Sequence, residues 1–389
     1  MPENSKDAFI VFGAPDIRGD EISAVEDVLR SGWLGTGPRV AEFESAFANY
    51  RGVSAERVAA VNSCTAGLHV SMIAAGLGPG DEVLTTAMTF CATVNSIIHA
   101  GATPVLVDID PVTRNIDTNL IRSRITQRTK AIVPVHFAGR PCDMDAIGAI
   151  ASEHGLTIIE DCAHAIESQW KEKPVGTFGD FGCFSFYVTK NITTGEGGMV
   201  IAKSDADIER IKILALHGMT KDAWRRFGDE GYKHYQVVEA GFKYNMMDLQ
   251  AAIGLHQLQR IEQGWKRRQE VWQQYQAAFE ELPVTCPSEP EADTRHAYHL
   301  YTLLIDEQIA GIDRDTFISR LTDEGIGVGV HYLSLASHPH YRERFGWRSG
   351  DYPAAALVSD RTVSLPLSAG LTDAEANRVI EATHRVLAQ

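Results

Sequence analysis

Long apolar runs are missing from this sequence: no stretch approaches the roughly 18 uninterrupted apolar residues of a membrane-spanning helix. Residues 1–10 contain no apolar core behind a basic start, so we expect no secretion signal. Basic residues are also scarce, with 36 Lys and Arg against 51 Asp and Glu and a formal net charge of -15. This charge repels nucleic-acid phosphates and anionic membrane surfaces. We therefore expect a cytoplasmic protein with neither a nucleic-acid nor a membrane partner.

Cysteine pairs are missing as well. The six cysteines stand far apart, at positions 64, 91, 142, 162, 183 and 286, with no CxxC pair and no zinc-like spacing. We expect them to be reduced and mostly buried thiols, and we expect no metal centre.

The chain has enough apolar material for more than one hydrophobic core. Its 389 residues exceed the size of a typical single core, and 44% of them are hydrophobic. We predict a large domain over residues 1–250, including an N-terminal segment, and a connecting helix with a small C-terminal domain over residues 251–389.

Between residues 57 and 202, short runs rich in β-branched residues alternate with helix-length segments, a pattern typical of βαβ units. This pattern predicts an α/β fold with a mostly parallel sheet covered by helices on both faces. Ligands bind such sheets at the carboxyl ends of the strands. The predicted strands span residues 58–61, 82–85, 103–107, 131–136, 156–160, 183–187 and 198–202, and predicted helices include 66–75, 90–100 and 144–154.

The C-terminal part has a different pattern. Apolar residues recur every three or four positions over residues 247–282, which predicts one long amphipathic helix that connects the two domains. Runs at 299–305, 326–332 and 362–365 read as strands, and a last helix is predicted from residue 372 to the end. Together they predict a small α+β domain.

Small polar residues at 62–67, Asn-Ser-Cys-Thr-Ala-Gly, lie between a predicted strand and a predicted helix. Free N–H groups and the positive end of the helix dipole make such a segment a candidate phosphate site. The alternative is a helix cap without a ligand, which is common for Ser and Thr.

Asp161 follows the buried run 156–160, so its carboxylate is expected at the end of a strand. A pyridine ring that acts as an electron sink needs a protonated ring nitrogen, and a fixed carboxylate provides this. The alternative is a carboxylate that caps the following helix.

In residues 184–198, a predicted strand carries Ser185 and Lys190 to a glycine-rich turn, and the next strand begins at Gly198. Most lysines are solvated surface groups with a pKa of about 10.4. A lysine that binds a cofactor aldehyde as an imine, and is released during turnover, can instead act as a base.

Taken in order, these segments resemble the DegT/DnrJ/EryC1/StrS family of sugar aminotransferases, pyridoxal-phosphate enzymes of fold type I, over nearly the whole chain. The resemblance rests on the order and spacing of seven separate segments, because an unrelated chain would have to match all of them by chance. The matching segments are residues 31–38, 64–68, 78–83, 160–165, 185–198, 241–248 and 364–367.

The resemblance implies that Lys190 binds pyridoxal 5'-phosphate as a Schiff base and moves the proton between the substrate and cofactor carbons. It implies that Asp161 pairs with the pyridine nitrogen. The cofactor phosphate would be held by Thr65, Ala66 and Ser185. One departure from the family pattern is Val188, where many relatives carry proline, and it puts the local turn geometry in doubt.

Three further positions match family residues around the cofactor. Phe90 would stack on the ring, with plain core packing as the alternative. His164 falls where relatives have a His or Gln near the ring, and a structural histidine is the alternative. Asn245 matches an asparagine that reaches the phosphate of the neighbouring subunit, which implies a C2 homodimer with shared active sites.

The implied reaction has two halves: an amino donor, glutamate by family analogy, loads the cofactor, and a nucleotide-linked keto sugar then takes the amine. Segments 32–37 and 331–341 resemble the family's substrate-facing loops, which makes Trp33, His331 and Tyr332 candidate substrate contacts. The alternative is that Trp33, His331 and His338 have only structural roles.

Ala163, His164 and the turn 193–198 resemble members that aminate C4 of a uridine-diphosphate 4-keto-6-deoxy sugar more than members that act at C3. A C3 aminotransferase remains an alternative. A second alternative is a dehydratase of the same family, whose known form has histidine in place of the lysine, and Lys190 argues against it. A non-catalytic regulatory homologue is a third, and the retained lysine, carboxylate and phosphate site argue against it.

Overall fold

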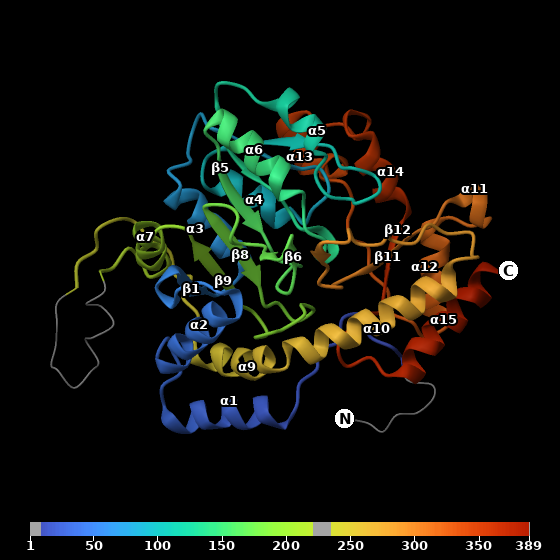
Figure 1. The fold of residues 1–389 in the computed structure, drawn as a ribbon, viewed down its shortest axis with the longest axis horizontal. Coiled ribbons are helices and arrows are strands. Elements are labelled where there is room, and N and C mark those ends of the chain that lie inside the picture. Colours follow the sequence, from blue (N-terminus) through green and yellow to red (C-terminus); the bar gives the residue numbers. More distant parts are fainter. Residues whose placement is uncertain (1–8, 221–234, 389) are drawn as a thin grey trace.

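The computed structural model describes residues 9–220 and 235–388. Its centre is a seven-stranded sheet in the order β1-β9-β8-β5-β4-β2-β3 (Figure 1). β9 pairs antiparallel with both β1 and β8, whereas the remaining pairs are parallel. The predicted mostly parallel α/β sheet is therefore confirmed. The sheet strands are β1 Val58–Val61, β2 Glu82–Thr86, β3 Thr103–Val107, β4 Thr129–Val133, β5 Thr157–Asp161, β8 Phe181–Ser185 and β9 Gly198–Ala202.

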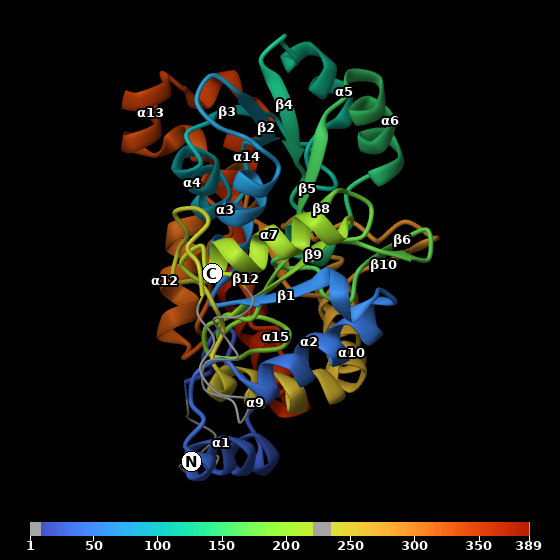
Figure 2. The same cartoon turned by 90° about the vertical axis from the view of Figure 1, so that its left-hand side faces the viewer.

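Helices cover both faces of this sheet because successive strand residues point to opposite sides. In β4, Ala131 and Val133 join a core formed with α3 and α7, whereas Ile132 joins a core formed with α5 and α6. Figure 2 shows these helices around the sheet. The helices of this part are α1 Gly19–Ser31, α2 Pro38–Arg51, α3 Cys64–Ala74, α4 Cys91–His99, α5 Thr118–Ile121, α6 Met144–His154 and α7 Asp205–Ala215.

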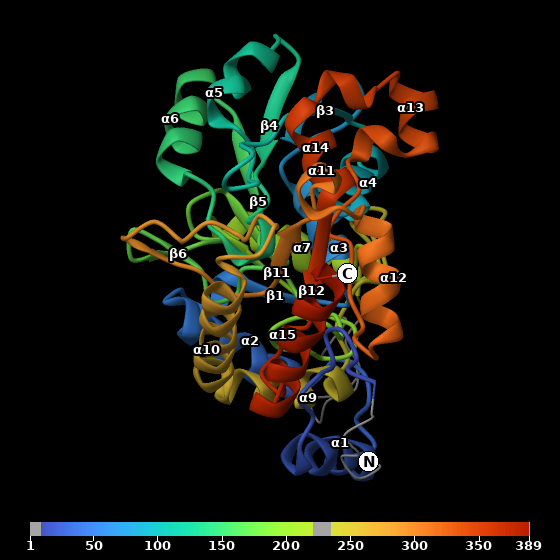
Figure 3. The same ribbon diagram turned by 90° about the vertical axis from the view of Figure 1, so that its right-hand side faces the viewer.

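A second core lies beside the small antiparallel pair β11 Tyr301–Leu304 and β12 Thr362–Leu365 (Figure 3). This pair packs with α10, α12 and α15, and Ile10 from the N-terminal segment joins the same core. The proposed division of the chain at residue 250 stays a prediction. The helices after residue 305 are α11 Glu307–Ala310, α12 Arg314–Asp323, α13 Pro339–Phe345, α14 Pro353–Arg361 and α15 Asp373–Leu387.

The predicted single helix over residues 247–282 is wrong in one respect: it is two helices, α9 Asp248–Gln259 and α10 Ile261–Phe279. The break is at Arg260, whose N–H bonds to the carbonyl of Gln257 at 3.2 Å, three residues back. Its guanidinium forms an ion pair with buried Glu21 at 2.5 Å. The break lies where the packing partner changes. α9 packs in the hydrophobic core that includes α2, whereas most of α10 packs in the core that includes β11 and β12.

The predicted strand at 326–332 is also wrong. The segment makes only isolated bridges, Ile326 to Ile10 and Gly329 to Ser364. A Cβ atom at Gly327 would lie 2.8 Å from the carbonyl oxygen of Ile10, so this residue passes too close to its neighbour for a side chain. The segment crosses between two neighbours instead of pairing along one of them.

The chain then returns to the large sheet. Leu335 donates to the carbonyl of Ala87 at 3.0 Å, just beyond β2, and residues of α13 and α14 share a core with Val94 and Leu106. This contact holds residues 331 and 332 over the carboxyl ends of the sheet strands. Three short strands, β6 Gln169–Trp170, β7 Lys173–Pro174 and β10 Thr294–Arg295, form a separate small sheet.

No helix in residues 9–220 and 235–388 combines the length and the apolar character needed to cross a bilayer. Residues 1–8, within the segment expected to carry no secretion signal, and residue 389, the end of the last predicted helix, lie outside the described residues.

Gly198, the first residue of β9, lies directly against the start of α3. A Cβ atom there would be 2.6 Å from the carbonyl carbon of Ser63 and 2.7 Å from the backbone nitrogen of Cys64. Backbone cannot give way as a flexible side chain can, so only glycine allows this approach.

We predict that Gly198→Ala lowers the free energy of unfolding by about 1–3 kcal/mol, because the added methyl overpacks a buried site. Chemical denaturation measures the change. Gly148→Ala in α6, where an added Cβ meets nothing within 4 Å, is the control, and it should raise stability by about 0.5–1 kcal/mol. Equal effects of the two substitutions would contradict the prediction.

Candidate active site

A cavity of about 490 Å³ lies at the carboxyl ends of the sheet strands, within the usual size of small-molecule sites. Its walls come from separate elements: the start of α3, the residue before α4, the ends of β5 and β8, the turn after β8, and the returning segment 331–332. Eight of the predicted site residues line it: Thr65, Phe90, Asp161, His164, Ser185, Lys190, His331 and Tyr332.

Lys190 lies in the turn after β8, where its backbone N–H bonds to the carbonyl of Tyr187 at 2.9 Å. Burial lowers the pKa of its amine to about 8, although Cys64 and Asp161 oppose the shift. A neutral amine is therefore much more populated near pH 8 than for a surface lysine. This property suits a lysine that attacks a carbonyl and exchanges protons.

Asp161 ends β5 with its side chain in the cavity wall and only 5% exposed. One carboxylate oxygen accepts from the hydroxyl of Thr93 at 2.8 Å, and the other accepts from the N–H of Ala163 at 3.1 Å. Burial raises the pKa of Asp161, against these hydrogen bonds and the nearby Lys190. A cation in the cavity would compensate the buried carboxylate.

His164 contributes a defined hydrogen-bond direction. Its Nδ1 accepts from the N–H of Ala138 at 3.3 Å, so the ring proton resides on Nε2, which lies 2.9 Å from the Tyr332 hydroxyl. Burial, with Lys190 and neighbouring histidines, holds the pKa of His164 well below its usual value. The neutral ring therefore donates to Tyr332, and the Tyr332 proton is free to point elsewhere.

The start of α3 is capped by Ser63, whose hydroxyl accepts from the N–H of Ala66 at 3.1 Å. That bond competes with the predicted phosphate contact of Ala66, and the N–H groups of Cys64 and Thr65 remain the first-turn donors. Ser185 ends β8 and lines the same cavity. The helix cap is thus confirmed for residues 62–67, whereas the phosphate site stays a prediction.

Phe90 and His331 also line the cavity. Phe90 is 57% exposed, which excludes plain core packing within this chain, and its ring lies 5.9 Å from that of Tyr332. His331 is held by a 2.8 Å contact between Nδ1 and the Ser364 hydroxyl, and burial lowers its pKa to about 4. His338 does not line this cavity.

Trp33 and Asn245 lie elsewhere: they line a different cavity, beside α2 and α7. The Asn245 amide donates to the Thr36 hydroxyl at 2.7 Å, and the Trp33 indole N–H donates to the Thr36 carbonyl at 3.1 Å. The structure therefore does not bring these two residues to Lys190 within one chain.

Several residues of this site are not among those predicted from the sequence. Thr93 holds Asp161 and is itself 2.9 Å from the hydroxyl of Thr89. Cys64 and Tyr187 line the cavity. The two threonines recur one helical turn apart in an otherwise apolar segment, a polar pattern that could have indicated an inward-facing hydrogen-bond chain.

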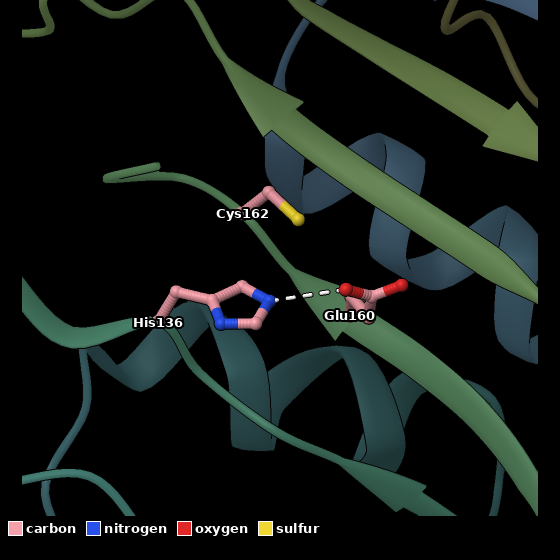
Figure 4. Close-up of side chains that lie close together, drawn as sticks. All are labelled: His136, Glu160 and Cys162. Carbon is pink, nitrogen blue, oxygen red and sulfur yellow. Dashed lines mark hydrogen bonds and ion pairs between the residues drawn. The ribbon is translucent and has the colours of Figure 1, made fainter. Parts of the chain in front are cut away.

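Behind Asp161, the side chains of His136, Glu160 and Cys162 form the only metal-like cluster among the described residues (Figure 4). Glu160 accepts from His136 Nε2 at 3.2 Å and from three backbone N–H groups, those of residues 176, 178 and 179, at 2.7–2.8 Å. His136 Nδ1 accepts from the N–H of Cys142. The carboxylate and both ring nitrogens are thus occupied, and the cluster braces the end of β5.

The cavity fits pyridoxal phosphate. It combines an amine of lowered pKa, a buried carboxylate that lacks a cationic partner in hydrogen-bond contact, and donors at a helix start. With the sheet described above, this site defines a fold type I pyridoxal-phosphate aminotransferase.

Comparison with known proteins identifies the family. The model of the DegT/DnrJ/EryC1/StrS aminotransferase family matches residues 15–384, and the chain belongs to this family. It is 47% identical over 380 residues to the spore coat polysaccharide biosynthesis protein SpsC of Bacillus subtilis, covering 97% of each chain.

Solved structures agree. The aminotransferase TlmJ from Streptoalloteichus hindustanus is 35% identical with a TM-score of 0.89, covering 98% of this chain and 99% of that one. The sugar aminotransferase Spr1654 from Streptococcus pneumoniae, in its PLP form, is 33% identical with a TM-score of 0.90, covering 98% and 99%. Its PMP form matches equally well, with a TM-score of 0.90. The protein is a sugar aminotransferase with pyridoxal phosphate as cofactor.

We predict that the Lys190 amine of the cofactor-free protein titrates near pH 8. Because only the neutral amine reacts, its acetylation by trace acetic anhydride should rise with pH and reach half its maximum near pH 8, against about 10.4 for ordinary lysines. Asp161→Asn removes a charge that raises this pKa, so the midpoint should move lower still. Peptide mass spectrometry reads the labelling, and a midpoint near 10.4 would disprove the burial argument.

Proposed function

We propose that this aminotransferase moves an amino group from L-glutamate to C4 of a nucleotide-linked sugar, a UDP-4-keto-6-deoxy sugar. The observation that carries the choice of C4 is the likeness of Ala163, His164 and the turn 193–198 to C4-acting members. The similarity to SpsC, a protein of polysaccharide biosynthesis, supports the proposal that the amino sugar is a precursor of a polysaccharide.

Bound pyridoxal phosphate supplies an electron sink for the negative charge that develops at the reacting carbon. In the proposed mechanism, Asp161 holds a proton at the ring nitrogen. The neutral amine of Lys190 would move the proton between the substrate carbon and the cofactor carbon, which are joined through the transferred nitrogen. Donors at the start of α3, with Ser185, hold the phosphate.

Tyr332 is proposed to bind the sugar. Because His164 Nε2–H donates to its hydroxyl, the Tyr332 proton is available to an oxygen of the substrate. Burial raises the pKa of Tyr332, so this proton is retained at neutral pH. His331, neutral at that pH, offers a second polar contact on the same wall.

We further propose a homodimer with shared active sites. Asn245 and Trp33 line a cavity separate from that of Lys190 in the same chain, so their predicted contacts with phosphate and substrate need a second copy. The Asn245 amide has a second N–H beyond the one bound to Thr36, and that hydrogen is the proposed phosphate donor.

Two alternatives use the same cavity. A C3 aminotransferase differs only in which sugar carbon faces Lys190. A dehydratase of the family has histidine in place of the lysine, so Lys190 speaks against it. The cytoplasmic location expected from the sequence stays part of the proposal.

Turnover tests the proposal. We predict that the holoenzyme with glutamate converts a UDP-4-keto-6-deoxy sugar to the 4-amino sugar, detected by mass spectrometry, and that Lys190→Ala reduces the rate by more than about 10³-fold because it lacks the proton carrier. A 3-keto isomer is the control substrate. Faster turnover of that isomer would refute C4 specificity, and normal turnover by Lys190→Ala would refute the role of the lysine.

The shared site makes a separate prediction. Lys190→Ala and Asn245→Ala should each be nearly inactive alone, whereas heterodimers formed by refolding the two variants together should regain about half of wild-type activity, because one of the two sites is then intact. Differently tagged chains allow the heterodimer to be purified. Absence of recovery in a purified heterodimer would refute the shared site.

A further inference from the structure

A buried ion pair lies behind the active site. Arg268 of α10 bonds through its guanidinium to Glu167 in the loop after β5, and the two side chains are 2% and 0% exposed. Burying both charges is costly, and such pairs are poor sources of stability compared with apolar packing. The pair instead presents one carboxylate oxygen, Glu167 Oε2, in a fixed direction.

That oxygen holds the residue next to Lys190. Asn191 Nδ2 donates to Glu167 Oε2 at 2.7 Å and to the carbonyl of Ala297 at 3.1 Å. Asn191 Oδ1 lies 2.8 Å from His299 Nδ1. An amide nitrogen only donates and an amide oxygen only accepts, so this orientation satisfies the whole side chain and requires a proton on His299 Nδ1.

His299 extends the network to the cavity wall. Burial, with Lys190, Arg268 and neighbouring histidines, holds the pKa of His299 well below its usual value, so the ring is neutral. It packs on the His164 ring with centroids 4.4 Å apart, and His164 bonds to Tyr332. One polar chain thus runs from α10 to the residue proposed to bind the sugar.

The turn that carries Lys190 lies between two cavities. Thr189 and Lys190 line the active-site cavity on one side and a second cavity, of about 370 Å³, on the other. Asn191 and Arg268 line that second cavity. Ile192 anchors the far end of the turn in the core of α2, and the hydrogen bonds of Asn191 hold the part that lies between the two cavities.

We infer that Asn191, clamped by Glu167 and Arg268, is a positioning residue that keeps Lys190 in the active-site cavity and fixes the tautomer of His299. The inference rests on the proposed role of Lys190. Asn191, Glu167, Arg268 and His299 are not among the site residues predicted from the sequence.

The first test is Asn191→Ala, which removes the clamp. The turn should then become more mobile and more hydrated. Because hydration favours the charged amine, the Lys190 pKa of the cofactor-free protein should rise toward about 10.4. In the holoenzyme, glutamate should change the absorbance of the bound cofactor about 10–100-fold more slowly, the usual cost of a misplaced reacting group. Labelling of Lys190 needs no substrate, so it separates failure of this inference from failure of the proposed reaction.

Gln257→Ala is the matched control. Gln257 Nε2 donates at 2.9 Å to Glu21, which forms a buried ion pair with Arg260, and at 2.8 Å to the carbonyl of Asp16. Gln257 also lines the second cavity, but these hydrogen bonds go to Asp16 and Glu21 and not to the lysine turn, so the substitution removes the same kinds of bond at a different place. We expect a similar loss of thermal stability in both variants but unchanged labelling and rate in Gln257→Ala. Equal changes in both variants would reduce Asn191 to a structural residue and overturn the inference.

Asn191→Asp tests the donor direction while it preserves size. It sets a carboxyl against Glu167, among Arg268, His299 and Lys190, and two carboxylates in contact retain a shared proton. The variant should act on glutamate only while that proton is held, so its rate should fall as pH rises through an ionisation that the wild type lacks. Gln257→Glu makes the same amide-to-carboxyl change beside Glu21. Like the wild type, it should not show this additional ionisation in its pH profile. A wild-type pH profile for Asn191→Asp would also overturn the inference.

Discussion

The structure depends on keeping one amine out of water beside one carboxylate. Asp161 ends β5 and Lys190 lies in the turn after β8, and the parallel pairing of these two strands brings their ends to the same edge of the sheet. Burial disfavours the charged form of each side chain, which is why the pKa of the lysine falls and that of the aspartic acid rises. Hydrogen bonds from Thr93 and Ala163 then hold the carboxylate without neutralising it.

The sheet could be predicted from the sequence because its strands are buried on both faces and read as short β-branched runs between helical segments. Strands β1, β3 and β9 match the predicted bounds, whereas β4 and β8 begin two residues earlier than expected. Periodicity could not show the break at Arg260, since apolar spacing continues across it while the packing partner changes. It also could not separate the extended segment 326–332 from a strand, because backbone pairing depends on neighbours distant in sequence.

Within the site, residues that touch the cavity directly could be predicted by resemblance, and eight of them do line one cavity. The supporting residues differ in this respect. The spacing of Thr89 and Thr93 is a local signal in the sequence, whereas Asn191 acts through an ion pair whose members stand 101 positions apart. Trp33 and Asn245 show that a motif can indicate a functional residue without showing which chain it serves. Within a single chain, neither residue lies in the cavity that contains Lys190.

The return of the chain from residue 331 to the large sheet ties one wall of the cavity to both cores. Leu335 is bonded beside β2, while Gly329 is bridged to β12 in the other core. A rotation of one core against the other would therefore stretch or compress the few peptide units between these two anchor points. The short segment between Gly329 and Leu335, which carries Tyr332, therefore couples the two cores. The width of the cavity entrance and the relative angle of the two cores cannot change independently.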